Sequence, residues 1–394
     1  MHIYDAEDYV LNSFNVPIVA YGGEEDPQLT ASREMKAALE REGVTFETEQ
    51  QNAIANQIPF LHLVGPKTGH RFHPDSLKLA MQFHAHHSAQ RAPFFRDQLR
   101  FITYTLKYPG AFGYTVLRMK EHYCPATIDA KKNNDGVVEI RTSNVAMLEL
   151  SRGLGRIKLG HDTYDLEAAA GGSLPTVLFA LRDGEWEGLE YVPSLWELRR
   201  NYAVKRPGLQ GPIDDAFSGP FLCVRGTGEA LSPALADWAT WNLERFAHEW
   251  DKYFRGKLPA KNDTEVTDQD IQDCNLILFG DPGSNKWIRE ILDRLPVEWT
   301  PENFTLGGEV YATRSHAPVF VYPNPLNARR YVVINSGHTF HELELKGSNA
   351  QLYPRLGDVA VVQFVKDAGG GYQEIVAHAG MFNEQWKLPL PAAK

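Results

Sequence analysis

Two short apolar runs with one helical stretch between them restrict the fold of the N-terminal region more than any other feature of the sequence. The runs, Val16 to Tyr21 and Phe60 to Val64, are typical of buried parallel strands. Residues 28–42 between them carry helix-forming residues, and Gly43 stands where a helix C-terminus favours glycine. We therefore expect a strand–helix–strand unit, with a crossover helix joining two strands of a parallel sheet.

The middle of the chain has a different pattern. Between residues 100 and 200, short runs of Thr, Tyr, Val and Ile are separated by turn pairs such as Asp135-Gly136 and Asp183-Gly184. The expected strands are Ile128 to Ala130, Val137 to Arg141, Met147 to Leu150 and Arg156 to Leu159. This pattern predicts an antiparallel β-sandwich-like module.

From Gly219 the alternation of strands and helices returns. Ser232-Pro233 places an N-cap residue before a proline at the first helical position, which predicts a long helix. The strands expected here are Phe221 to Val224, Asn275 to Phe279, Pro318 to Tyr322 and Tyr331 to Asn335, followed by a β-rich tail from about Leu352. We expect a second, three-layer α/β unit.

The charge balance and the cysteines exclude several classes of protein. Lys and Arg total 40 and Asp and Glu total 50, a formal charge of −10 that gives no global attraction to nucleic acid or to an anionic membrane surface. No run approaches the roughly 18 apolar residues of a membrane helix, and the acidic start of the chain is unlike a secretory signal. Three widely spaced cysteines, Cys124, Cys223 and Cys274, predict buried thiols rather than disulfides or a zinc cluster.

Asp26 and His70 each follow one of the two N-terminal apolar runs. Side chains just beyond the carboxyl ends of neighbouring parallel strands can converge above the sheet. Their order and spacing fit the last two members of the Ser…Asp…His triad of an α/β-hydrolase. The alternative is that Asp26 caps the following helix and that His70 is an ordinary loop histidine.

Longer stretches around these two residues resemble a known family. Residues 15–26 (NVPIVAYGGEED) and 65–74 (GPKTGHRFHP) resemble the C-terminal end of the catalytic domain in prolyl oligopeptidase-like α/β-hydrolases. Other stretches resemble the long C-terminal extension of large hydrolase-like proteins from environmental bacteria: 211–217 (GPIDDAF), 275–285 (NLILFGDPGSN), 324–327 (NPLN) and 335–337 (NSG). The resemblance implies serine-type hydrolysis of an ester or peptide bond, with Asp26 as the orienting acid and His70 as the base.

The nucleophile that this family needs does not follow from the sequence. The chain contains no Gly-x-Ser-x-Gly elbow, and the 25 residues before Asp26 are too few for the strands, elbow and oxyanion loop of such a site. We expect either that the chain is the C-terminal part of a larger serine hydrolase, or that it works through another site.

These features divide the chain into three segments. We expect a partial α/β-hydrolase-like segment at 1–98, a β-rich sandwich-like module at 99–205, and the second α/β unit with its β-rich tail at 206–394. A layer of only two strands would expose apolar edges, so we expect it to pack on a neighbouring domain or on a second copy of the chain as a homo-oligomer.

A second candidate site lies in the C-terminal unit, where polar loops follow three of the expected strands. If those strands are parallel neighbours, their loops share one edge of the sheet and can bind an anionic or polyhydroxylated ligand. The residues expected to line this crevice are Arg225, Thr227, Asp281, Ser284, Asn285, Ser336 and His338. The alternative is that Gly280-Asp281-Pro282-Gly283-Ser284 is an ordinary turn and helix cap.

Two further patterns concern a metal site and a pair of catalytic carboxylates. His84, His86 and His87 suggest a metal site, but their spacing on a helix favours a solvated face. The neighbouring carboxylates Asp214 and Asp215 leave open a glycoside hydrolase, although adjacency in sequence does not place them across a substrate. We expect no metal or other cofactor, and a small-molecule, peptide or sugar substrate. A non-catalytic accessory or carbohydrate- or peptide-binding portion is the alternative to a hydrolase.

Overall fold

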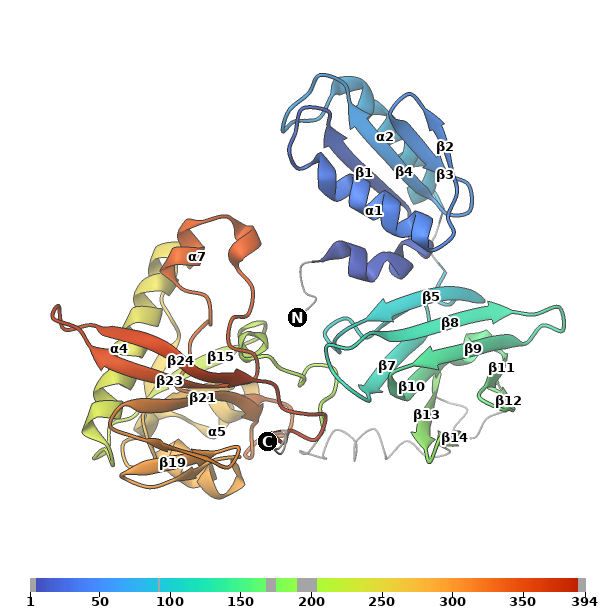
Figure 1. The fold of residues 1–394 in the computed structure, drawn as a ribbon. Helices are drawn as coiled ribbons and strands as arrows, with labels where there is room; N and C mark the ends of the chain where they lie inside the picture. Colours follow the sequence, from blue (N-terminus) through green and yellow to red (C-terminus); the bar gives the residue numbers. More distant parts are fainter. Residues whose placement is uncertain (1–4, 91–92, 168–174, 190–203, 389–394) are drawn as a thin grey trace. The chain divides into compact units, whose positions relative to one another are not determined.

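The computed structural model describes residues 5–90, 93–167, 175–189 and 204–388. The chain divides into two compact units, Met1–Val192 and Pro193–Lys394, whose described residues form three β-sheets and two β-sheets, respectively. Among the residues described, the buried apolar side chains form three clusters: one in the N-terminal α/β segment, one in the β-rich middle and one in the second unit. The expected mixed α/β, multi-domain architecture is confirmed at this level (Figure 1).

The N-terminal segment is a four-stranded sheet in the order β1-β4-β3-β2. Its elements are η1 (Ala6–Phe14), β1 (Ile18–Gly23), α1 (Leu29–Arg41), β2 (Phe46–Glu49), β3 (Asn52–Ala55), β4 (Phe60–Gly65) and α2 (Pro74–Ser88). Strands β1 and β4 are parallel, with Ile18 opposite Phe60 and Gly23 opposite Gly65, so the predicted strand–helix–strand unit is confirmed. The antiparallel hairpin β2–β3 was not predicted.

The two helices of this segment cover opposite faces of its sheet (Figure 1). Ala38 and Leu39 of α1 are buried with Phe60 of β4 and Val10 of η1, and together they form the core of this segment. Helix α2 buries only Ser76 and Ala80. Apolar side chains on α2 are therefore left in solvent, with Leu77, Leu79 and Met81 between 43% and 61% exposed.

The middle of the chain forms two five-stranded sheets, β14-β13-β10-β7-β6 and β12-β11-β9-β8-β5. The strands are β5 (Gln98–Thr103), β6 (Gly110–Ala111), β7 (Tyr114–Met119), β8 (Ala126–Lys132), β9 (Val138–Ser143), β10 (Val145–Ser151), β11 (Arg156–Leu159), β12 (Asp162–Asp165), β13 (Thr176–Arg182) and β14 (Glu185–Leu189). Side chains from both sheets share one core, as in a β-sandwich. All four predicted strands fall in β8 to β11, but β9 and β11 pair in parallel, which departs from the antiparallel expectation.

Asparagine side chains join η1 to the edge strand β5. The Asn12 amide donates to the Ile102 carbonyl at 3.0 Å and accepts from the Ile102 amide at 3.0 Å, and Asn15 makes the same pair of bonds with Arg100. These side-chain amides replace the missing neighbouring strand and cover the β5 edge. The α/β segment and the sandwich therefore belong to one unit.

The second unit contains a seven-stranded sheet in the order β16-β15-β17-β22-β21-β23-β24 and a small sheet, β18-β19-β20. Its strands are β15 (Phe221–Arg225), β16 (Ala260–Asn262), β17 (Asn275–Phe279), β18 (Glu298–Trp299), β19 (Asn303–Leu306), β20 (Glu309–Ala312), β21 (His316–Pro323), β22 (Tyr331–Ile334), β23 (Val359–Lys366) and β24 (Tyr372–Gly380). Its helices and helical turns are η3 (Ile213–Phe217), α4 (Pro233–Glu249), the π-helical turn η4 (Trp250–Phe254), η5 (Asp263–Glu265), α5 (Asp268–Asp273), α6 (Lys286–Ile291), η6 (Leu292–Arg294), α7 (Glu342–Lys346) and η7 (Asn349–Gln351).

The first four strands of the large sheet are parallel and the last three are antiparallel. Strand β15 has β16 on one side and β17 on the other. After β16 the chain therefore crosses back over β15, and the next strands are added on the opposite side. Helix α4 packs on β15 and β17, and its Trp238 ring stacks on Phe364 of β23. The predicted strands and the helix after Ser232-Pro233 are all present, and β23 and β24 form the β-rich tail.

A buried ion pair anchors Lys205 within the second unit. The Lys205 ammonium lies 2.6 Å from the Asp358 carboxylate, and both side chains are 0% exposed. The Lys205 backbone also donates to the Glu384 carbonyl at 2.8 Å. Lys205, which was expected to end the middle segment, therefore belongs to the second unit. Within the described ranges, no helix is long and apolar enough to span a membrane.

Candidate functional site

Asp26 and His70 meet beyond the carboxyl ends of β1 and β4. The His70 Nδ1 atom lies 2.9 Å from the Asp26 Oδ2 atom, and the Asp26 Oδ1 atom accepts the Gln28 backbone N–H at 2.9 Å. The Asp26 side chain is 10% exposed, whereas the His70 side chain is 79% exposed. The expected convergence of these two side chains is therefore present in the structure.

The loops that carry Asp26 and His70 pack directly on each other. A Cβ atom on Gly23 would lie 2.2 Å from the Thr68 carbonyl oxygen and 2.3 Å from that of Gly69, so only glycine allows this approach. The Glu25 N–H donates to the Thr68 carbonyl at 3.0 Å, and the Glu24 carboxylate accepts the Lys67 N–H at 2.8 Å. These backbone contacts fix the distance between the acid and the imidazole.

Tyr21 of β1 holds the loop that carries His70 by hydrogen bonds to its backbone. Its hydroxyl donates to the Arg71 carbonyl at 2.9 Å and accepts the His73 N–H at 2.9 Å, so it binds the backbone just after His70. Its ring stacks on Phe72 with a centroid distance of 4.1 Å. Gly65 makes room for the hydroxyl, because a Cβ atom there would lie 2.2 Å from it. Sequence reasoning did not identify Tyr21, since it has the pattern of a strand residue.

The electrostatics of the pair suit an ionised acid and an oriented imidazole. The pKa of Asp26 is lowered, first by the Gln28 backbone N–H and then by the His70 hydrogen bond. A carboxylate only accepts hydrogen bonds, so the contact assigns a proton to Nδ1 of His70. In that tautomer Nε2 is the nitrogen that can take a proton from a nucleophile.

A cavity of about 440 Å³ opens beside the pair. Ser32 of α1 lies in its wall together with Asp26 and His70. The buried Ser32 hydroxyl lies 3.0 Å from the Leu29 carbonyl oxygen and 3.2 Å from Nε2 of His62. Burial lowers the pKa of His62, with further contributions from Lys36 and Arg33, so this imidazole is held neutral. Sequence reasoning missed Ser32 and His62, because their contact joins a helix to a strand 30 positions away.

In the second unit, the polar groups of the loop after β17 bind one another. The Asp281 Oδ1 atom accepts the Gly283 and Ser284 N–H groups, and Oδ2 accepts the Ser232 N–H. The Asn285 Oδ1 atom accepts two N–H groups at the start of α6, while its amide donates to the carbonyls of Val224 and Phe279. Both side chains are 0% exposed. Turn and helix-cap bonds therefore engage these oxygens and this amide.

The loops after β15 and β17 are in backbone contact. The Gly228 N–H donates to the Ser284 carbonyl at 2.8 Å, and a Cβ atom on Gly226 would lie 2.7 Å from the same oxygen. Thr227 donates to Asp263 at 2.6 Å, whereas Arg225 is exposed at the end of its strand. The structure thus brings these predicted residues to one edge of the sheet, as expected, and packs their loops together there.

His338 follows β22 and lies among aromatic rings. Its imidazole is 14% exposed, and its Nδ1 atom lies 3.6 Å from the Asp214 carboxylate. The rings around it, at centroid distances of 4.6 to 5.9 Å, belong to Phe217, Phe246, Trp250, Phe254 and Phe340. Ser336, two positions earlier, is buried and donates to the Gly337 carbonyl.

The neighbouring carboxylates Asp214 and Asp215 have separate structural partners. Asp214 accepts both the N–H and the hydroxyl of Thr339, and Asp215 accepts the Tyr331 hydroxyl at 2.8 Å. Each carboxylate therefore anchors η3 to a different segment near β22. This arrangement gives no support to a pair of carboxylates facing one sugar.

The candidate metal-binding histidines and the cysteines form no comparable site among the described residues. His84 and His86 are exposed on α2 and His87 is half-buried, and the described residues contain no group of three or more His, Cys, Asp or Glu placed to hold a metal ion. The three cysteines are free, but only Cys223 is buried, since Cys124 and Cys274 are half-buried. Burial raises the pKa of the Cys223 thiol, which makes it a poor nucleophile.

Comparison of the chain with protein-family models, with curated proteins and with solved structures gives no match.

Proposed function

We propose that this chain carries the acid–base half of a serine-type hydrolase that acts on ester or peptide bonds. Asp26 orients the imidazole of His70, and His70 transfers the proton of a nucleophilic hydroxyl and then returns it to the leaving group. The observation that carries the proposal is the 2.9 Å contact between His70 Nδ1 and the ionised Asp26 carboxylate at the carboxyl ends of two parallel strands.

We further propose that the nucleophile belongs to a polypeptide segment outside this sequence. Strand β1 lies at the edge of its sheet, and its residues Ile18 to Tyr21 are only half-buried. A sheet edge with unpaired backbone groups is normally paired with a further strand or covered by another element. The exposed apolar residues of α2 have the same explanation, because a larger catalytic domain would cover them.

Ser32 is the internal alternative, since its hydroxyl lines the same cavity and contacts a neutral imidazole. Its hydrogen bonds to the Leu29 carbonyl and to His62 are also those of an ordinary helix-to-sheet contact. We therefore favour a structural role for Ser32. A direct comparison of Ser32→Ala with the unchanged chain tests this choice.

The experiment has two arms. In the first, the chain is treated with a fluorophosphonate probe and with a nitrophenyl ester, and we expect neither labelling nor turnover. Labelling that disappears in Ser32→Ala would overturn the external nucleophile. In the second arm, the polypeptide is extended upstream in the same reading frame, and we expect labelling of a serine in a Gly-x-Ser-x-Gly elbow.

In the extended polypeptide, His70→Ala and Asp26→Asn are expected to lower the rate of ester hydrolysis by roughly 10³-fold or more. His84→Ala is the matched control, because this exposed histidine lies outside the cavity and should leave the rate unchanged. An upstream region without the elbow, or a rate that His70→Ala does not change, would overturn the proposal.

A further inference from the structure

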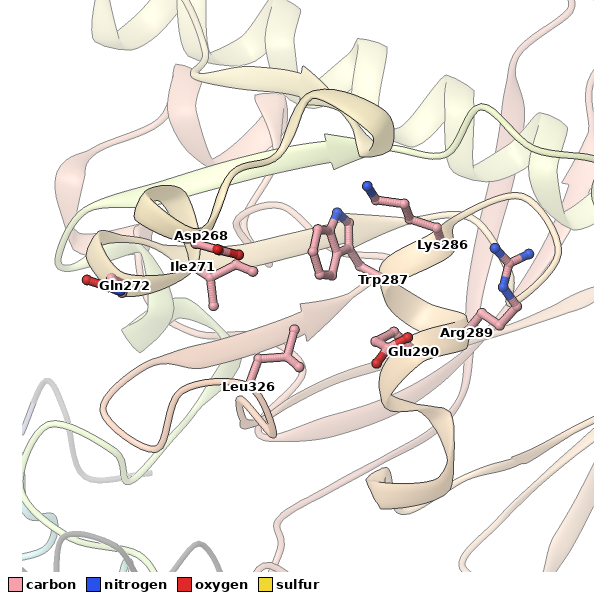
Figure 2. A pocket seen from close by; sticks show the side chains of 8 residues that line it. All are labelled: Asp268, Ile271, Gln272, Lys286, Trp287, Arg289, Glu290 and Leu326. Atoms are coloured by element: carbon pink, nitrogen blue, oxygen red, sulfur yellow. The ribbon is translucent and has the colours of Figure 1, made fainter.

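A cleft between α5 and α6 in the second unit has the features of a ligand site and is separate from every residue considered so far as catalytic. It encloses about 630 Å³, within the range of about 300–1,000 Å³ that is usual for small-molecule sites. Its floor is apolar and is formed by Trp287, Ile271 and Leu326 (Figure 2). We call this feature the α5–α6 cleft.

The floor of the α5–α6 cleft is held in place by hydrogen bonds beneath it. The Trp287 indole N–H donates to the Asp263 carbonyl at 2.9 Å, which fixes the orientation of the ring. Behind Leu326, the Asn327 amide donates to the Ile271 carbonyl at 2.8 Å, and Arg330 donates to the Gln272 carbonyl at 3.1 Å. Such a floor is organised before a ligand arrives, so little order has to be gained on binding.

The rim of the α5–α6 cleft is polar and its charges balance. Figure 2 shows the side chains of Asp268 and Gln272 on one side of Trp287, and those of Lys286, Arg289 and Glu290 on the other. In the described part of the chain, the polar groups of these five side chains form no ion pair or hydrogen bond with protein atoms; the Lys286 ammonium lies over the Trp287 ring at 4.7 Å from its centroid. Cationic hydrogen-bond donors and anionic hydrogen-bond acceptors therefore surround the Trp287 ring.

The geometry points to a saccharide site, in which the α5–α6 cleft binds one or two neutral pyranose rings. The C–H face of a pyranose stacks on an indole, and its hydroxyl groups both donate to carboxylates and accept from guanidinium and ammonium groups. Two cations and two carboxylates give no net charge to attract a phosphate or another ion. The inference does not rest on the hydrolase proposal, because it uses none of the residues of the N-terminal site.

The test is calorimetric titration of the whole chain with cellobiose, maltose, lactose, xylobiose, mannobiose and chitobiose. We expect at least one of these sugars to bind with a Kd below about 10 mM. Trp287→Ala should weaken that binding at least tenfold, whereas Trp287→Phe, which keeps an aromatic surface and the fold, should retain part of it. Glu290→Ala should also weaken it, because a hydroxyl acceptor is removed.

Tyr108→Ala is the control, since Tyr108 is an aromatic residue that is 73% exposed outside the α5–α6 cleft, and it should leave sugar binding unchanged. Saturation-transfer NMR should show contact between the bound sugar and an indole in the unchanged chain and in Tyr108→Ala, but not in Trp287→Ala. Three results would overturn the inference: no binding of any sugar in the panel, binding that Trp287→Ala leaves intact, or tighter binding of inorganic phosphate than of the sugars.

Discussion

Replacing Gly23 by alanine should separate the acid from the imidazole. The new Cβ atom would lie 2.2 Å from the Thr68 carbonyl oxygen and 2.3 Å from that of Gly69. A carbon–oxygen contact needs about 3.3 Å, so the two loops must move apart by roughly 1 Å. Both obstructing atoms belong to the backbone, so no side-chain rotation can relieve the clash.

The consequence can be worked out for the Asp26–His70 pair. A movement of roughly 1 Å would lengthen the present 2.9 Å contact to about 3.9 Å, beyond hydrogen-bonding range. It would also break the bond from the Glu25 N–H to the Thr68 carbonyl. Adding about 1 kcal/mol for the lost Glu25 hydrogen bond to about 1–3 kcal/mol for overpacking gives a destabilisation of about 2–4 kcal/mol.

Hydrogen exchange of the β1 and β4 amides measures this change, because it reports the stability of the N-terminal segment separately from the second unit. Nitrogen-15 NMR of the histidines measures the hydrogen bond, since the signal of the Nδ1 proton that His70 donates to Asp26 should be lost. Gly69→Ala is the matched control: it lies in the same loop, yet its Cβ atom would meet nothing within 4 Å. We expect it to change stability by less than about 1 kcal/mol. Unchanged exchange and an intact Nδ1 proton in Gly23→Ala would refute the reasoning.

Three other variants or conditions have definite expected outcomes. Tyr21→Phe removes the hydroxyl that joins the Arg71 carbonyl and the His73 N–H, and should destabilise the N-terminal segment by about 1–3 kcal/mol in the same exchange measurement. Lys205→Met leaves the buried Asp358 carboxylate without its ammonium and should cost the second unit about 3–5 kcal/mol in denaturant unfolding; Lys205→Met combined with Asp358→Leu should cost less than the single change. Hydrogen bonds from lysine side chains lower the pKa of Asp270 and of Glu342 to about 2, so their stabilisation should be complete above pH about 5 and be lost as the pH falls towards 2. Acid unfolding monitored by circular dichroism should show this loss, and Lys261→Met should reduce the part that Asp270 contributes; a second unit equally stable at pH 2 and 5 would contradict it.

The elements that could be predicted are those with a strong local pattern. Strands β1, β4, β15 and β17 are continuous apolar runs, and α4 begins at a Ser-Pro pair, so each was expected close to its observed position. The hairpin β2–β3 was missed because Phe46–Glu49 is mostly exposed and alternates too weakly to predict a strand. The parallel pairing of β9 with β11 was missed because it depends on contacts between distant segments.

In the candidate sites, too, the residues placed by a local sequence pattern could be predicted, whereas those that depend on contacts between distant segments could not. The convergence of Asp26 and His70 follows from their positions after two parallel strands. The contributions of Tyr21 and Gly23 depend on a loop more than 40 residues away, which a local pattern does not reveal. For the loop containing Asp281 the sequence left open a ligand crevice or an ordinary turn and helix cap, because both have the same turn sequence; in the structure its carboxylate accepts backbone N–H groups of Gly283, Ser284 and Ser232. The α5–α6 cleft was missed because two short helices and the loop at Leu326 come together only in the fold.

The most direct test of the central claim is the rate at which the upstream-extended polypeptide forms an acyl-enzyme from a nitrophenyl ester, followed by the release of nitrophenol and by mass spectrometry. We predict a burst of nitrophenol and an acyl group on the elbow serine, and we predict that His70→Ala abolishes both while the chain stays folded. An acyl-enzyme that forms at an unchanged rate without His70, or one attached to Ser32, would contradict the account.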